Sequence, residues 1–396
     1  MKIKVRPEDF VVRESIDLPL SAEPRRFAVF ALAKRQWDTF DLVDYLARRL
    51  RVERRDIRLG GIKDRYGDTE QLISIRAEGR RLPDLTASGF TLRLQGYTEE
   101  PLSARSVAGN RFRIVVRDID PHLSARYRRA LESLRDGGLP NYYDEQRFGS
   151  ARHGQGFMGK ELFLRRREEA LRLYFTPSRH DDRRTRELKS CVTRSWGRWD
   201  ECLPLAFGDY RPVLEYLAAH RRSFTEALGR LDRRFLVFVL NAYQSYLFNE
   251  ILSGYLRSLG RAHDLALLSR SYRHGAFLYP ESLPPALLAT LREVRLPVPG
   301  HDSDIRDEAV RAIAEGVLER EGVGWDDLRV RQLSRVQVHG VERAMLAFPQ
   351  GLAVSEAVGD ELYPGRDRLT LEFGLPRGSY ATLLLKRLEA VPMPAA

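Results

Sequence analysis

The chain contains very little cysteine. Only Cys191 and Cys202 occur among its 396 residues. Two cysteines do not make a disulfide framework of the kind found in small secreted domains, and they do not make a metal-binding cluster. The eight His residues include no pair at metal-ligand spacing, and no HExxH motif occurs. We therefore expect no metal site.

Long apolar runs are also missing. No uninterrupted apolar segment of the sequence reaches the length that crosses a membrane. Residues 1–6 lack the apolar core of a signal peptide. These absences predict a soluble, cytoplasmic protein without a membrane-spanning segment.

Lysine is scarce, whereas arginine is abundant. Lys supplies only seven of the 66 basic residues, and the formal net charge is +11. A basic chain favours a polyanionic partner. Arg binds phosphate with two parallel hydrogen bonds and stacks on bases, which suits RNA. A GC-rich genome produces the same bias towards Arg, so composition alone is weak evidence.

The length exceeds the usual size of a single hydrophobic core, so we expect two domains. Apolar periodicity predicts strands over residues 3–14 (an edge strand broken by Pro7), 27–32, 72–75, 91–94, 111–116, 344–348 and 368–373. It predicts helices over residues 39–50 (with Thr39 as N-cap), 122–135, 161–175 and 235–259, and an irregular, polar segment over 176–210. In the helix over 235–259, the expected core residues are Phe238, Tyr243, Tyr246, Leu247 and Ile251. Strand-rich ends around a helix-rich middle predict an insertion, with domain segments 1–158, 159–343 and 344–396.

A glycine-rich loop over residues 60–71 precedes one predicted strand. Its sequence GGIKDRYGDTEQ places Asp64 between Lys63 and Arg65. Two neighbouring cations favour the ionised carboxylate and lower its pKa. An ionised carboxylate in a glycine-lined loop suits a nucleophile or a general base. The alternative, a polar turn with a solvated Asp, is more frequent for such loops.

Two further segments invite a functional interpretation. Residues 139–149, LPNYYDEQRFG, combine aromatic side chains, amides and one Arg, as a pocket for a flipped base requires. A turn with core aromatics explains the same pattern equally well. Residues 154–161 fit GxxxxGK, but Glu161 replaces the Ser or Thr that binds magnesium, so we reject a phosphate-binding P-loop.

These segments belong to a set of motifs that resembles the TruD family of tRNA pseudouridine synthases. The motifs are KVRPEDFVV at 4–12, GIKD at 61–64 with TEQ at 69–71, GNRF at 109–112, PNY at 140–142 with QRFG at 146–149, and LP at 375–376 with GSYAT at 378–382. NAYQSYLFN at 241–249 is similar to a helix of the family's inserted domain. Each motif alone is weak, but their order and spacing over nearly the whole chain are specific.

The resemblance implies an α+β fold. Its catalytic domain has a mixed, mainly antiparallel sheet that is circularly permuted relative to other pseudouridine synthases. A helix-rich α/β domain, the TRUD domain, is inserted between the fourth and the last motif. The implied activity is isomerisation of uridine to pseudouridine in tRNA, usually at uridine 13 of the D arm.

The resemblance also assigns residues. Asp64 takes the position of the catalytic aspartate, while Lys4, Phe10 and Asn141 match active-site positions. Two aromatic positions of the pocket, one of them usually Phe, are Tyr143 and Tyr380 here. RNA contacts are expected from Lys63, Arg65, Gln146 and Arg147. After the last motif the family usually has Arg-Glu-Leu, and this chain has Lys386-Arg387-Leu388.

The implied chemistry breaks the N1–C1′ bond of uridine, turns the uracil and joins C5 to C1′. No redox step or external reactant enters, so we expect no cofactor and no metal. Asp64 acts either as nucleophile or as base on C2′. The target base must leave the folded tRNA and enter a closed apolar pocket, for which Phe10, Tyr143 and Tyr380 are candidate walls.

Two other functions remain open. The first is a tRNA-binding protein without catalysis, such as a folding chaperone, and the presence of Asp64 speaks against it. The second is a hydrolase or nuclease that acts on RNA with carboxylates, which normally requires a metal-binding acidic cluster or a His pair, and the sequence lacks both.

Overall fold

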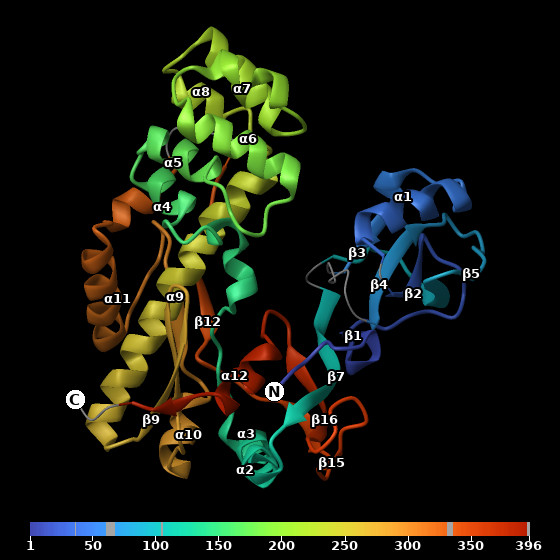
Figure 1. Cartoon of the computed structure of the whole chain (residues 1–396). Coiled ribbons are helices and arrows are strands. Elements are labelled where there is room, and N and C mark those ends of the chain that lie inside the picture. The colour runs from blue at the N-terminus through green and yellow to red at the C-terminus, as the bar shows by residue number, and fades with distance from the viewer. Residues whose placement is uncertain (36, 61–67, 104–105, 331–335, 394–396) are drawn as a thin grey trace. The chain divides into compact units, whose positions relative to one another are not determined.

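The structure, a computed structural model, describes residues 1–35, 37–60, 68–103, 106–330 and 336–393 (Figure 1). The chain forms two compact units. The first contains Met1–Leu139 and Ala347–Leu388, and the second contains Pro140–Leu346 and Glu389–Ala396. The first unit is therefore built from both ends of the chain. The domain boundaries expected from the sequence, between residues 158 and 159 and between residues 343 and 344, stay a prediction.

A mixed, mainly antiparallel sheet forms the first unit, as predicted. In the described part of the chain this sheet has 10 strands, and β1 with β4 is its parallel pair. Eight strands follow one another in the order β14 (Gln350–Val354), β16 (Asp367–Pro376), β7 (Val107–Ile119), β1 (Phe10–Ile16), β4 (Asp68–Arg76), β2 (Phe27–Arg35), β6 (Phe90–Thr98) and β5 (Leu85–Ala87). Off this path, β15 (Val358–Gly359) pairs with β16, and β3 (Ile57–Leu59) pairs with β4.

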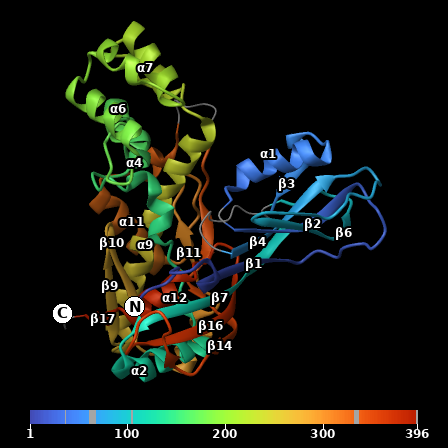
Figure 2. The same ribbon diagram turned by 45° about the vertical axis from the view of Figure 1, so that its right-hand side comes forward.

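Helix α1 (Thr39–Leu50) covers one face of this sheet (Figure 2). Its buried Leu42 and Leu46 pack with Ile73 and Ile75 of β4 in one apolar core. The predicted bounds of this helix are confirmed. In the first turn, Asp38 Oδ1 accepts a hydrogen bond from the Asp41 nitrogen at 3.4 Å, and Thr39 as the N-cap stays a prediction. The first unit also contains η1 (Pro7–Asp9), η2 (Arg54–Asp56), α2 (Pro121–Glu132), α3 (Leu134–Gly137) and α12 (Thr382–Leu388).

The prediction of an edge strand at residues 3–14 is wrong. Pro7 lies in η1, and β1 begins only at Phe10. Strand β1 then pairs with β7 on one side and with β4 on the other, so it lies inside the sheet. Alternation of apolar and charged residues marks a strand but does not reveal how many neighbours it has.

Helix α9 (Arg233–His263) is the longest element of the second unit (Figure 1). Its Tyr243, Leu247 and Ile251 are buried, as predicted. Phe238 is 37% exposed, so its assignment to the core is wrong. Among the described residues, no helix is long and apolar enough to span a membrane.

Shorter elements complete the second unit. Its helices are η4 (Glu145–Ala151), α4 (Met158–Phe163), α5 (Arg167–Tyr174), α6 (Arg183–Arg194), η5 (Trp199–Glu201), η6 (Leu203–Leu205), α7 (Tyr210–Ala219), α8 (Phe224–Leu228), α10 (Pro285–Leu291), α11 (Glu308–Glu321) and η7 (Trp325–Leu328). Strand β9 (Leu267–Tyr272) pairs with β10 (Gly275–Pro280) and β17 (Val391–Pro392), and β11 (Arg295–Val298) pairs with β12 (Val341–Ala344). Strands β8 (Leu139–Pro140) and β13 (Leu346–Ala347) lie where the chain passes between the units.

Helix α6 lies in the segment that we predicted to be irregular. Asp182 caps it by accepting a hydrogen bond from the Thr185 nitrogen at 2.7 Å. Leu188 and Val192 are its buried residues, and two apolar anchors at this spacing are too few for a clear periodic signal.

The predicted helix over 161–175 is divided into α4 and α5, because Arg165 adopts a left-handed backbone with φ 59°.

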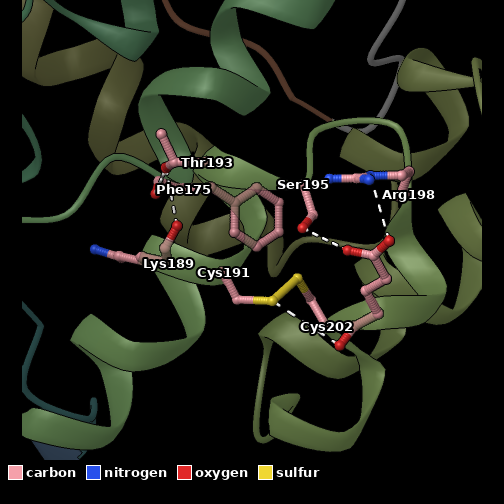
Figure 3. The surroundings of a disulfide bond; sticks show 8 residues. Phe175, Lys189, Cys191, Thr193, Ser195, Arg198 and Cys202 are labelled. Atoms are coloured by element: carbon pink, nitrogen blue, oxygen red, sulfur yellow. Dashed lines mark hydrogen bonds and ion pairs between the residues drawn. A yellow bond between two sulfur atoms is a disulfide. The ribbon is translucent and has the colours of Figure 1, made fainter.

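One disulfide bond joins Cys191 of α6 to Cys202, which follows η5 (Figure 3). The two residues are 11 positions apart, and Cys202 is almost fully buried. We expected no disulfide framework, and the structure adds a single local bond. The pair ties α6 to the short helical turns that follow it.

Candidate active site

Four of the motif segments lie on four neighbouring strands of the first unit. Strand β16 pairs Pro376 with Gly109 of β7, and β7 pairs Phe112 with Val12 of β1. A Cβ atom on Gly109 would stand 2.4 Å from the Leu375 carbonyl oxygen, so a side chain at this position would force the two strands apart. The glycine of the GNRF motif therefore permits close contact with the last motif.

The fourth segment follows the glycine-rich loop. In the parallel pair, Val11 of β1 is the register partner of Asp68, where the described chain resumes after residues 61–67. At the other end of the loop, the Gly60 nitrogen donates to the Leu72 carbonyl at 3.1 Å. Both described ends of the loop are thus bound to the strands that carry the motifs.

Lys4 and Phe10, two of the predicted site residues, lie together. The Lys4 ammonium stands 4.3 Å from the centroid of the Phe10 ring, within the range of a cation–π interaction. Phe10 is buried and contacts Phe112 edge to face at 6.4 Å, and Phe112 stacks on Phe373 at 5.3 Å. The first unit therefore presents an exposed ammonium over one end of an aromatic row.

A buried ionic cluster lies beside this pair, and we call it the Arg117 network. Its members are Arg117, Asp9, Asp360 and Glu361. The Arg117 guanidinium donates from Nε and Nη2 to both Asp9 oxygens, each at 2.9 Å, and from Nη1 to Asp360 Oδ1 at 2.9 Å. The side chains of Arg117, Asp9 and Asp360 are at most 4% exposed, and Glu361 stands at the surface, 3.0 Å from Nη2.

The hydrogen bonds of the Arg117 network shift the pKa values of Arg117, Asp360 and Glu361. The bonds to Asp9 raise the pKa of Arg117 above its ordinary value. The hydrogen bond from Arg117 lowers the pKa of Glu361 to about 2. Burial alone would raise the pKa of Asp360, but backbone N–H groups and Arg117 lower it further than burial raises it. Arg117, Asp360 and Glu361 are therefore ionised at neutral pH.

Asn141 and Tyr143, two more predicted residues, lie in the second unit. The side-chain amide of the buried Asn141 is engaged at both ends: Oδ1 accepts from Arg343 Nη2 at 2.6 Å, and Nδ2 donates to the Ala344 carbonyl at 3.1 Å. The guanidinium of Arg343 also lies 4.2 Å from the Tyr143 ring centroid. One arginine thus binds the amide and covers the neighbouring aromatic face.

The backbone of Tyr143 is held by a side chain of α9. Its N–H donates to Asn249 Oδ1, and its carbonyl accepts from Asn249 Nδ2, both at 2.8 Å. Asn249 is 1% exposed. We call this pairing the Asn249 clamp, because one buried amide satisfies both polar groups of a single backbone residue.

The predicted RNA contacts Gln146 and Arg147 lie on η4 of the second unit. Gln146 is exposed, and Arg147 is half-buried. Arg147 donates from Nε to Ser245 Oγ at 3.1 Å, with its guanidinium 5.6 Å from the Tyr143 ring centroid. Arg147 therefore lies beside Tyr143, whereas Gln146 faces solvent. Among the described residues, no group of three or more His, Cys, Asp or Glu side chains could hold a metal ion.

The family model for tRNA pseudouridine synthase D (TruD) matches residues 1–388. The chain belongs to the TruD family. "tRNA pseudouridine synthase D" from Aquifex aeolicus is 29% identical over 395 residues, covering 98% of both chains. "Probable tRNA pseudouridine synthase D 1" from Methanococcus maripaludis is also 29% identical, over 98% of this chain and 99% of its own length. The crystal structure of the "Putative tRNA pseudouridine synthase D (TruD)" from Methanosarcina mazei matches with a TM-score of 0.72 and 25% identity, over 98% of this chain and 92% of that one.

Other residues that the resemblance to TruD singled out add less to the geometry of the site. Lys63, Asp64 and Arg65 fall within residues 61–67, outside the described residues. Tyr380 is half-buried just before α12, where its carbonyl accepts a hydrogen bond from the Leu383 nitrogen at 3.2 Å. Arg387, at the position where TruD proteins usually have Glu, is buried and donates to the Ala130 carbonyl at 3.1 Å.

Four residues that contact the predicted site residues or their neighbours in the chain were not predicted from the sequence. Asp9 and Asn249 stand inside motifs that we had recognised, but nothing in those motifs indicated a role for either. Arg117 and Arg343 stand outside every motif. Arg343 is 202 residues from Asn141 in the sequence, so only the fold reveals this contact.

Proposed function

We propose that the chain is a tRNA pseudouridine synthase, an isomerase that converts uridine to pseudouridine, with uridine 13 of the D arm as the target. The family match over residues 1–388 carries this proposal. Two arrangements, each inside one unit, support it: Lys4 contacts Phe10, and Arg343 contacts both Asn141 and Tyr143. Both arrangements place a cationic side chain over an aromatic ring of the predicted site.

In this proposal Asp64 is the catalytic residue. It acts as nucleophile at C1′ or as base at C2′. The register of Val11 with Asp68 supports this role, because the strand that follows the Asp64 loop begins beside the strand that carries Phe10. The Lys4 ammonium then favours the ionised Asp64 carboxylate.

The bond changes define the other requirements. The N1–C1′ electron pair leaves with the uracil, C5 bonds to C1′, C5 loses its proton to solvent, and N1 gains one. The detached uracil must turn without escaping, which calls for flat apolar walls. Phe10, Tyr143 and Tyr380 are the proposed walls, and Arg343 keeps Tyr143 in a fixed orientation.

The substrate in this proposal is a folded tRNA whose target base is flipped out of its stack. Arg side chains bind the phosphates, a contact that dominates affinity for nucleic acids. Gln146 and Arg147, next to Tyr143, contribute to RNA binding near the base.

The test measures tritium release from tRNA labelled with [5-³H]uridine, without added metal or cofactor, followed by mapping of the modified position. We expect wild-type protein to release the C5 tritium with the RNA chain intact. Asp64→Asn should abolish release while tRNA affinity stays within about threefold, because an amide is neither nucleophile nor base. Asp68→Asn, a carboxylate change at the start of the next strand, is the matched control and should retain activity.

Other outcomes point elsewhere. Tight tRNA binding without tritium release by wild-type protein would favour the non-catalytic RNA-binding function. Cleavage of the RNA chain or release of free uracil would favour a hydrolase. Full turnover by folded Asp64→Asn protein would refute the assignment of the catalytic residue.

A further inference from the structure

The segment that carries Lys4 is attached at both ends to a single residue. At one end, the Lys2 and Arg117 backbones exchange two hydrogen bonds, each 2.8 Å long. At the other end, the Arg117 side chain binds both oxygens of Asp9. Lys4 lies between these two attachments, and Phe10 follows directly after the second.

The backbone of Lys4 needs such support. Lys4 has φ 58°, in the left-handed region that residues with a Cβ atom rarely adopt. Such conformations persist only when the surrounding structure enforces them. The two attachments to Arg117 restrict the segment from both sides. Because Asp9 is adjacent to Phe10, the same restraint holds the backbone directly before the ring that lies beneath the Lys4 ammonium.

The Arg117 network is built to hold a fixed geometry. The fork of Arg117 forms two parallel bonds to Asp9, an arrangement that defines direction as well as distance. Asp9 Oδ2 also accepts from the Arg6 nitrogen at 2.9 Å. On the far side, Asp360 Oδ2 accepts from the Asp118 nitrogen at 3.0 Å, so the guanidinium is held from both directions.

We propose that Asp9 and Arg117 are positioning residues, which act on the reaction by holding the Lys4 ammonium over Phe10. Neither residue contacts the substrate. The proposal rests on the proposed function for its catalytic consequence, but the placement of Lys4 is a separate, measurable property. The experiments substitute Asp9 by Asn, because Asn is nearly the same size and cannot pair ionically with Arg117.

The first experiment observes Lys4 directly by NMR. The chain has seven lysines, so the ¹³C-labelled lysine ε-methylene signals are few enough to assign by substitution. An ε-methylene above an aromatic face is shifted upfield by the ring current. We expect this shift for Lys4 in the wild type, its loss in Phe10→Leu and its loss in Asp9→Asn. Asp367→Asn, which removes a carboxylate that binds Ser124 at 2.6 Å in the same unit, is the matched control and should keep it.

The second experiment is a double-mutant cycle on single-turnover tritium release. We expect Asp9→Asn to lower the rate about 10–100-fold, the cost of misplacing a catalytic group. If Asp9 acts through Lys4, adding Asp9→Asn to Lys4→Met should reduce the rate no further than about twofold. If Asp9 had a merely structural role, the rate losses of the two single variants would instead multiply in the double variant. Arg117→Lys keeps the charge but loses the fork, and it should behave like Asp9→Asn.

The outcomes separate this proposal from the proposed function. Retention of the upfield Lys4 signal in Asp9→Asn would overturn the positioning role, whatever the activity. Multiplying losses in the cycle would overturn it as well. If wild-type protein released no tritium, the proposed function would fail, and the NMR experiment would still decide whether Asp9 and Arg117 place Lys4.

Discussion

The Arg117 network and the Asn249 clamp fix two predicted site segments by different chemistry. In the first unit, one buried guanidinium pairs with two buried carboxylates and so holds the segment before Phe10. In the second unit, one neutral amide satisfies the backbone of Tyr143. An ionic network and a neutral hydrogen-bonded pairing thus each restrain a site segment, but they differ in their sensitivity to pH. The charged network depends on the ionisation of its carboxylates, and the amide pairing does not.

The largest expected effect comes from removing the cation. Arg117→Met leaves Asp9 and Asp360 buried without a counter-charge, so the free energy of unfolding should fall by about 3–5 kcal/mol. Urea denaturation at pH 7 measures this loss. The matched control is Arg113→Met on the same strand, whose exposed pair with Glu372 at 3.5 Å should be worth less than about 1 kcal/mol. Equal losses for the two variants would mean that burial adds nothing to the Arg117 network.

A smaller effect is expected from the neutral pairing. Asn249→Leu leaves the N–H and the carbonyl of Tyr143 without their partner, so the free energy of unfolding should fall by about 2–4 kcal/mol. Asn241→Leu provides the control. This residue lies on the same helix and is half-buried, and the change should cost less than about 1 kcal/mol. If the two leucine variants proved equally stable, the Asn249 clamp would not be a restraint.

The smallest effect, and the one that separates the two chemistries, is a pH dependence. The pKa of Glu361 is about 2 in the folded protein, below the ordinary value of 4.5, so its contribution to stability is present above pH 4.5 and is lost as the pH falls towards 2. The melting temperature of Glu361→Gln should therefore lie below that of the wild type at pH 7, with a difference that shrinks over this window. The difference between Asn249→Leu and the wild type should stay constant there. A constant difference for Glu361→Gln would show that this carboxylate does not stabilise the folded state.

The sequence predicted best where local pattern decides the structure. The bounds of α1 follow from its helical period, and β2, β4, β6 and β7 appear where apolar runs placed strands. Each of these strands extends beyond the predicted run, because pairing with neighbours continues through charged residues such as Arg35 and Arg76.

The remainder depends on contacts between distant segments. The place of β1 inside the sheet and the exposure of Phe238 are set by what packs against them, which periodicity does not encode. The same holds for the site. Motifs identified Lys4, Phe10, Asn141 and Tyr143, whereas the side chains that hold them came from distant segments of the chain or had no distinctive local pattern.

The pairing of β7 with β16 has a consequence for how the protein is made. Strand β7 ends at Ile119 and its neighbour β16 begins at Asp367, and Pro140–Leu346 of the second unit lies between them. On the ribosome, β7 therefore lacks its neighbour β16 until nearly all of the second unit has been synthesised. Nascent domains fold largely in the order in which they emerge. The second unit can thus acquire much of its structure while one edge of the first unit's sheet is still open, and a stalled ribosome would expose that edge to aggregation.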